Sequence, residues 1–257
     1  GEFGYETWPQ DAYLKSGGAN AWSGFSLDLK NEIVYISTGS AAFDYYGGDR
    51  EGSNLFANSI IALNPNDGSR LWHYQVTHHD IWDRDLPAAP NLIDIQIKEK
   101  KVKALAQITK SGYLFVLDRI SGKPIYPIKE KNVPLSKLEG EKAWPTQPVP
   151  TVFPSFSRNK LTELDFPLRS KKAYEFSKKL WENRIYGEFE PLTTKGNILF
   201  PGLDGGGEWG GAAFNPKTNI LYINSNEMPW DLSMEKIEGT ALGETIYKTA
   251  CLSCHGN

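Results

Sequence analysis

Short apolar runs broken by polar turns recur along the chain and predict many short β-strands. Apolar and polar residues alternate in some of these runs, which is the spacing of a strand with one buried face. Other runs pair across a polar turn rich in Asn, Asp or Gly and predict β-hairpins. The predicted strands lie at 21–27, 33–37 and 71–76, and the predicted hairpins at 60–72, 114–126 and 213–222.

Two of these hairpins, at 60–72 and 114–126, repeat related residue types at one spacing. Recurrence of a small antiparallel unit roughly every 50 residues is typical of a β-propeller. An antiparallel sandwich with similar turns is the alternative, and the shared register favours the propeller. The matched positions are Ala62 and Val116, Asn64 and Asp118, Gly68 and Gly122, and Trp72 and Tyr126.

Residues 129–192 break this rhythm and are predicted to form a long insertion. The part at 134–154 is rich in proline and lysine. The part at 164–185 has apolar residues at a helical spacing, among Lys, Glu and Arg. The chain is therefore predicted to be all-β, part of a propeller, with one helix in an insertion.

Composition and charge narrow the possible functions. Of 257 residues, 40% are hydrophobic and 23% are charged, so a folded core is expected. The net charge is -3, which argues against a nucleic-acid partner. The sequence contains neither an apolar run long enough to span a bilayer nor a signal peptide at its start. Membrane contact is therefore expected only through parts outside this chain.

The stretch from His78 to Pro87 is unusually dense in polar side chains. It follows the predicted strand at 71–76, and a polar loop presented by a rigid strand is where sites often lie. A surface loop whose charges satisfy one another is the alternative. The stretch contains His78, His79, Asp80, Trp82, Asp83, Arg84 and Asp85.

The segment 202–211 is rich in glycine and surrounds Glu208 and Trp209. Glycine lets a backbone approach another group closely. The segment is not a phosphate-binding loop, because the Lys-Ser/Thr that would end one is missing. A tight hairpin turn with a packed Trp remains the alternative.

Cys251, Cys254 and His255 form a Cys-x-x-Cys-His motif, which attaches c-type haem. The two thiols bind the haem covalently, and the histidine is an axial ligand of the iron. A zinc site would need a further ligand, and the chain has no other cysteine. A thioredoxin-like pair would need a βαβ unit, which is not predicted. Haem c is therefore expected in the full-length protein.

Together these segments resemble the pyrroloquinoline quinone (PQQ)-dependent glucose and alcohol dehydrogenases, in particular the membrane-bound glucose dehydrogenase-like branch with a fused cytochrome c. The resemblance implies an eight-bladed propeller, of which residues 1–235 would form only a part. Residues 236–257 would form a linker and the beginning of the cytochrome c domain. The segments that carry the resemblance are 20–24, 38–40, 54–59, 78–90, 109–113 and 205–222.

The resemblance also implies roles for individual residues. Asp83 matches the catalytic base, and Lys110 matches the residue that hydrogen-bonds the reactive quinone oxygens. Trp22 matches the indole on which PQQ stacks, while Glu208 and Trp209 would border the cofactor. From residue types alone, alternatives stay open: a core Trp, a lysine turned to water, and an aspartate paired with Arg84 or His79.

A Ca²⁺ (or Mg²⁺) ion is also implied, with Asp83 and Ser40 as ligands. Ser40 lies where many alcohol dehydrogenases of the family have an asparagine, and serine is a poorer metal ligand. The implied reaction is oxidation of a sugar or alcohol hydroxyl in the periplasm. Electrons would pass to haem c and then to a cytochrome c or quinone of the respiratory chain. A non-catalytic propeller that binds or assembles other molecules is the alternative.

Overall fold

The computed structural model describes residues 2–236 and Gly243, and most of its regular structure is β. This confirms the all-β prediction. Helix α1 (Lys171–Asn183) is accompanied by three 3₁₀ turns, at Tyr5–Thr7, Ala12–Leu14 and Glu163–Asp165. The strands are β1 (Phe25–Asp28), β2 (Ile33–Ser37), β3 (Ser59–Leu63), β4 (Arg70–Gln75), β5 (Asn91–Ile97), β6 (Lys100–Ile108), β7 (Leu114–Asp118), β8 (Ile128–Asn132), β9 (Thr146–Pro150), β10 (Ile185–Tyr186), β11 (Asn197–Leu199), β12 (Ala212–Asn215), β13 (Ile220–Ile223) and β14 (Trp230–Leu232).

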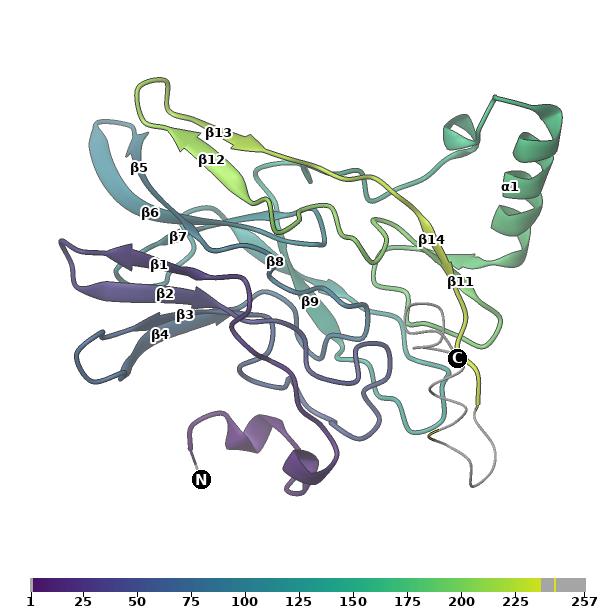
Figure 1. Ribbon diagram of the computed structural model, residues 1–257, viewed down its shortest axis with the longest axis horizontal. Coiled ribbons are helices and arrows are strands. Elements are labelled where there is room, and N and C mark those ends of the chain that lie inside the picture. The colour runs from purple at the N-terminus through teal and green to yellow at the C-terminus, as the bar shows by residue number, and fades with distance from the viewer. Residues whose placement is uncertain (1, 237–242, 244–257) are drawn as a thin grey trace.

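The strands form small separate sheets, and neighbours along the chain pair antiparallel except in the sheet β10-β11-β14, where β10 and β11 pair parallel. One sheet has the order β1-β2-β3-β4, and the next has the order β5-β6-β7. Strands β8 and β9 form one further pair, and β12 and β13 another. In Figure 1 these sheets lie on one side of the molecule, while the long loops and α1 lie on the other. Successive antiparallel sheets of this kind are the blades of a propeller.

The repeated register has a physical cause at the seam between the first two sheets. Gly68 and Gly122 both adopt φ of 72°, in turns that begin at Asn64 and Asp118. The Trp72 indole lies directly on Gly122, where a Cβ atom would stand 2.6 Å from the ring. The indole also donates a hydrogen bond to the carbonyl of Arg119, at 3.1 Å. The tryptophan of one unit therefore docks on the glycine turn of the next.

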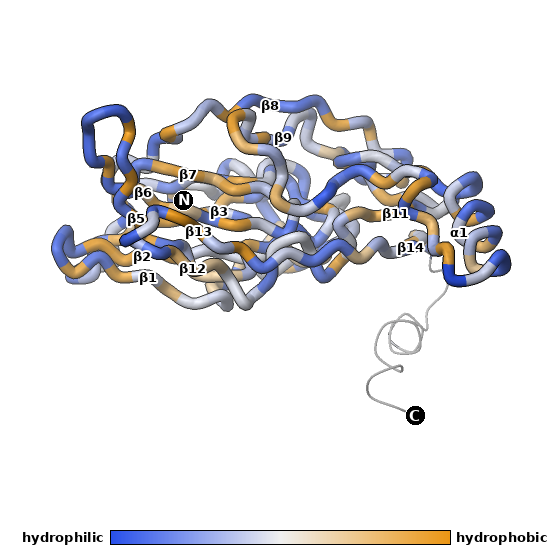
Figure 2. Tube along the Cα trace, turned by 90° about the horizontal axis from the view of Figure 1, so that it is seen from above, coloured by the Kyte–Doolittle hydropathy of each residue, from blue (hydrophilic) through white to orange (hydrophobic). Residues whose placement is uncertain are grey.

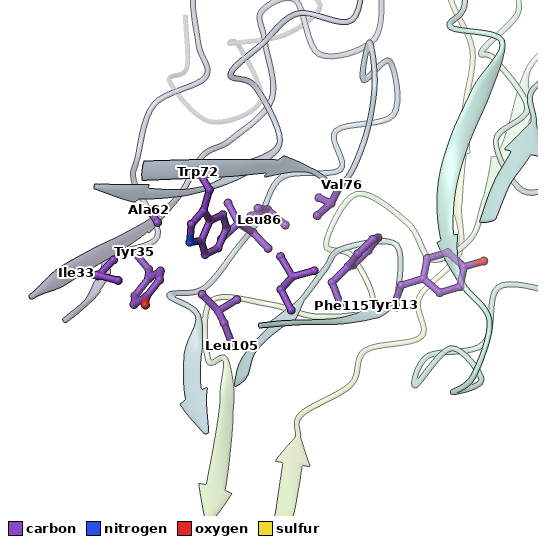
Figure 3. Packing of buried hydrophobic residues seen from close by; sticks show 11 residues of the cluster. Ile33, Tyr35, Ala62, Trp72, Val76, Leu86, Leu105, Tyr113 and Phe115 are labelled. Carbon is purple, nitrogen blue, oxygen red and sulfur yellow. The ribbon is translucent and has the colours of Figure 1, made fainter. Parts of the chain in front are cut away.

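The main hydrophobic core fills this same seam. Figure 3 shows Trp72 and Leu86 gathered with Leu105 and Phe115 between the two sheets. Leu86 belongs to the polar stretch that follows β4 and is fully buried. Figure 2 shows the apolar positions concentrated along the strands, with hydrophilic residues at the turns. The core therefore fixes both the angle between the sheets and the base of the loop that carries Asp83.

Several elements differ from the sequence prediction in their extent. Strand β1 begins at Phe25 rather than at residue 21, because Gly24 has φ of 88° and leaves the extended conformation. After β7, only an isolated bridge joins Pro124 to Leu117, since proline has no N–H for a ladder. Helix α1 is shorter than the predicted range and begins after Ser170, whose hydroxyl caps it.

The range 129–192 contains α1 together with β9, β10 and most of β8. The predicted boundary between the propeller and the linker, at 235–236, stays a prediction, because nearly all of 236–257 lies outside the described residues. Cys251, Cys254 and His255 lie outside the described residues. Within the part of the chain that the structure describes, no helix is both long and apolar enough to cross a bilayer.

Candidate active site

The loop after β4 is buried, and its charged groups find most of their partners elsewhere in the chain. His79 and Asp80 are each 1% exposed, and Arg84 is 6% exposed. The Arg84 guanidinium donates to the carbonyls of Pro201 (2.7 Å) and Gly202 (3.1 Å). The alternative of a self-satisfied surface loop is therefore wrong, because this loop ties the glycine-rich segment to the sheet.

The Asp80 carboxylate sets the shape of the loop. It accepts hydrogen bonds from the backbone N–H groups of Trp82 (3.0 Å) and Arg84 (2.6 Å). Asp83 lies between these two donors and adopts the left-handed conformation, with φ of 58°. Such a φ is uncommon for a residue with a side chain, so it needs surrounding contacts to hold it. Asp80 supplies those contacts and thereby presents Asp83.

Asp83 forms an ion pair with Lys110, whose Nζ lies 3.0 Å from Oδ2. The two side chains are 18% and 10% exposed. Burial raises the pKa of Asp83 to about 7, against the opposing effect of the Lys110 ammonium, and the charges of Asp85 and Asp80 add to the rise. A carboxyl group that titrates near neutral pH is suited to accept a proton in catalysis.

Lys110 lies in the turn between β6 and β7, inside the protein. Its residue exposure is only 8%, so the alternative of a turn lysine facing water is wrong. Its own carbonyl accepts from Gly206 N–H (2.6 Å), and the Thr109 carbonyl accepts from Gly207 N–H (3.1 Å). The partner of Asp83 is thus this distant lysine, and neither Arg84 nor His79.

Trp22 precedes β1 and keeps its indole at the surface, with 44% of the residue exposed. The indole N–H donates to Asp85 Oδ2 at 3.1 Å. Gly39 passes close beside this edge, since a Cβ atom there would stand 2.8 Å from Nε1. Trp22 is therefore no core residue. Its edge is held in place, and an aromatic face of this kind can stack on a flat ring.

Glu208 and Trp209 occupy a turn closed by a hydrogen bond from Gly211 N–H to the Glu208 carbonyl (2.8 Å). Trp209 is 79% exposed, and the segment joins β11 to β12, which lie in different sheets, so the alternative of a tight hairpin turn with a packed Trp is wrong. Burial raises the pKa of Glu208, and the Lys110 ammonium opposes the rise. Their contact with a cofactor stays a prediction.

The two predicted metal ligands, Ser40 and Asp83, have different hydrogen-bond partners. Ser40 Oγ donates to the Asp80 carboxylate and lies 3.2 Å from Asn58 Nδ2, while Asp83 bonds Lys110. Among the described residues, no group of three or more His, Cys, Asp or Glu side chains could hold a metal ion. Ca²⁺ takes six to eight oxygen ligands. These residues alone do not make a calcium site, and the ion stays a prediction.

Sequence reasoning missed the residues that hold the loop from outside. Asn58 Nδ2 donates to Asp80 Oδ2 (2.8 Å) and to the Arg84 carbonyl (2.9 Å). Glu141, in the predicted insertion, bonds His79 Nε2 at 2.8 Å, and both side chains are fully buried. Asn58 belongs to a segment that carries the family resemblance, which was its only signal. Glu141 has no signal in the sequence.

A family model described as the glucose/ethanol/alcohol dehydrogenase β-propeller domain, PQQ, matches residues 1–249. The chain belongs to this family. The resemblance stated from the sequence is thereby confirmed.

Two curated relatives share more than a third of the aligned residues with this chain. Quinoprotein glucose dehydrogenase A of Acinetobacter calcoaceticus is 36% identical over 219 residues, which are 82% of this chain and 27% of that protein. Quinoprotein glucose dehydrogenase of Gluconobacter oxydans is 38% identical over 216 residues, 82% of this chain and 26% of that protein. The chain therefore spans about a quarter of the length of these relatives.

Solved structures agree with the propeller assignment. A quinohaemoprotein alcohol dehydrogenase from Pseudomonas putida matches with a TM-score of 0.58 and 27% identity, over 88% of this chain and 28% of that one. A europium-containing methanol dehydrogenase matches with a TM-score of 0.61 and 23% identity, over 94% of this chain and 36% of that one, and shows the fold alone.

Proposed function

We propose that this chain is the part of a quinoprotein dehydrogenase that removes the hydroxyl proton from a sugar or alcohol, with Asp83 as the base. The observation that carries the proposal is the buried Asp83–Lys110 pair, with a carboxyl pKa of about 7. A base is most effective when its pKa lies near the working pH. Membership of the PQQ-dependent family supports the same reading.

The residues around this pair fit a flat, anionic quinone in part. Trp22 offers an exposed aromatic face whose edge is fixed by Asp85. Lys110 offers a cation that can hydrogen-bond carbonyl oxygens. Bound PQQ would supply the acceptor for the hydride that leaves the substrate carbon.

Within that arrangement, each side chain has a distinct task. Asp83 in its ionised form takes the hydroxyl proton, and such general-base help contributes roughly two to four powers of ten in rate. The Lys110 ammonium keeps part of the Asp83 population ionised near neutral pH. It also stabilises negative charge that develops on a nearby oxygen during the reaction. Asp80 and Arg84 keep the loop fixed, so that the base needs no rearrangement.

The electrons would leave through haem c bound at Cys251, Cys254 and His255, to a cytochrome c or quinone in the periplasm. A c-type motif beside a quinoprotein propeller supports this route, because the reduced cofactor must be reoxidised after each turnover. A haem stain of the full-length protein tests it. The stain should be positive and should disappear in Cys251→Ala, whereas an unchanged stain in this variant would contradict the assignment.

Dye-linked oxidation of glucose, glycerol and ethanol by the full-length protein, loaded with PQQ and Ca²⁺ or Mg²⁺, tests the proposed function. Asp83→Asn should lower kcat by roughly two to four powers of ten, since amides are not bases. Asp67→Asn is the matched control, because Asp67 lies in the exposed turn between β3 and β4 and its side chain accepts hydrogen bonds from Ser69. Bound PQQ without turnover of any substrate would instead support a non-catalytic binding module.

A further inference from the structure

The glycine-rich segment contacts, through its bare backbone, the turn that carries Lys110, the ion-pair partner of the candidate base. At Gly205, Gly206 and Gly207, an added Cβ atom would meet a neighbour at 3.0 Å or less. The neighbours belong mainly to the turn between β6 and β7, which holds Lys110. Gly210, in the same segment, has no neighbour within 4 Å. The close contact with the β6–β7 turn is therefore made by Gly205, Gly206 and Gly207, whereas Gly202 meets Met228 and Trp230 instead.

The contact at Gly205 is with Lys110 itself. An added Cβ atom would stand 2.7 Å from Lys110 Cβ and 2.9 Å from Lys110 Cα, and closer still to Lys110 Cγ. Real Cβ atoms essentially never approach so closely, so a side chain at Gly205 requires the lysine to move. The hydrogen bond from Gly206 N–H to the Lys110 carbonyl (2.6 Å) holds the two backbones together. Because Cα and Cβ move only with the backbone, relief of these contacts displaces Lys110 from its base and not its side-chain end alone.

We propose that Gly205 is a positioning residue for Lys110: its lack of a side chain leaves the space in which the lysine stem lies and so places the ammonium against Asp83. The glycine-rich segment then acts on Asp83 indirectly, through the position of Lys110. Only the kinetic readout of this inference rests on the proposed function.

Chemical labelling of the lysine tests the inference without cofactor or substrate. Acetic anhydride acylates exposed amines, and mass spectrometry measures the fraction modified at each lysine. In Gly205→Ala, acylation of Lys110 should rise by up to about sevenfold, the ratio of the side-chain exposures of Lys101 (71%) and Lys110 (10%). Lys101 should not change and serves as the internal reference.

Two matched variants separate the contact from other effects of alanine. Gly68→Ala imposes a comparable backbone strain, because Gly68 has φ of 72° and Gly205 has φ of 82°, yet Gly68 has no neighbour within 4 Å. Gly210→Ala changes the same segment without a contact. Neither should alter labelling of Lys110. Unchanged labelling in Gly205→Ala, or an equal rise in either control, would overturn the inference.

A double-mutant cycle keeps the test decisive if Gly205→Ala weakens folding. The variant should lower the urea midpoint more than Gly68→Ala does. In a Lys110→Ala background, which removes the Cγ contact and keeps the contacts at Cβ and Cα, that excess should become smaller. An excess of the same size in both backgrounds would refute a contact between Gly205 and the lysine stem.

The pH profile of turnover adds a readout that a merely structural role would not move. In Gly205→Ala, the displaced ammonium no longer lowers the pKa of Asp83, so the half-maximal pH for activity should rise. A profile unchanged from wild type would count against the inference. If the wild-type protein shows no turnover, the proposed function fails, while the labelling result still decides the position of Lys110.

Discussion

Replacing Asp83 by asparagine should increase the protein's stability relative to wild type as the pH rises. This direction is opposite to that expected for an aspartate whose pKa is lowered in the folded protein. Burial raises the Asp83 pKa from 3.8 to about 7. Between these values the folded protein holds a proton that the unfolded chain has released. The free energy of unfolding of wild type therefore falls as the pH rises through this window.

The magnitude follows from the size of the shift. A rise of about 3 pKa units corresponds to about 4 kcal/mol, since each unit is worth about 1.4 kcal/mol. Asp83→Asn has no such proton to lose, and its amide oxygen can still accept from Lys110. The free energy of unfolding of the variant relative to wild type should thus increase by up to about 4 kcal/mol from about pH 4 to about pH 8.

Urea unfolding followed by tryptophan fluorescence at several pH values measures this difference. Asp67→Asn is the control, because hydrogen bonds from Ser69 lower the pKa of Asp67. Asp67 therefore stabilises the fold fully above its unfolded pKa, so its variant should lose relative stability as the pH rises toward about 4 and should change little from about pH 4 to about pH 8. The reasoning fails if Asp83→Asn follows the direction of Asp67→Asn, or if its relative stability does not change with pH.

Three further changes test other parts of the structure. Gly122→Val should lower the free energy of unfolding by roughly 1 to 3 kcal/mol or more, because its side chain overlaps the Trp72 indole; urea denaturation measures it. Glu141→Ala should cost roughly 1 to 3 kcal/mol, since it leaves the buried His79 Nε2 without its hydrogen-bond partner; thermal and urea unfolding would both show the loss. Trp22→Ala should weaken PQQ binding by about 0.5 to 1.5 kcal/mol with little loss of stability, as the indole is exposed; fluorescence titration measures the affinity.

The sequence predicts local features of this fold well, because their causes are local. The hairpin at 60–72 is determined by its own turn residues, and the same kind of turn occurs in the repeat at 114–126. The β5–β6 hairpin was missed, although it contains the longest strand of the described part of the chain. Strand β5 alternates apolar and polar residues from Ile93 to Ile97, so a local signal was present there and was not used.

In the candidate site, too, the sequence indicated individual residues and did not indicate the pairings that depend on packing. Asp83 and Lys110 were singled out through a resemblance, and the structure brings them to 3.0 Å. The charge density of the loop alone did not reveal which groups pair, because each partner comes from a different part of the chain. His79 bonds Glu141, 62 positions away, and such a pairing depends on how the sheets and the insertion pack. Local sequence patterns carry no record of that packing.

The docking of Trp72 on Gly122 is a one-way contact: one blade contributes the indole and the next contributes the bare turn. A head-to-tail interface of this kind can be repeated from unit to unit around a closed ring, whereas a symmetric contact would end with a pair. Because Leu86 is buried in the same seam, the angle between two blades also sets where the Asp83 loop stands. The position of Asp83 therefore depends on the angle at which neighbouring blades pack.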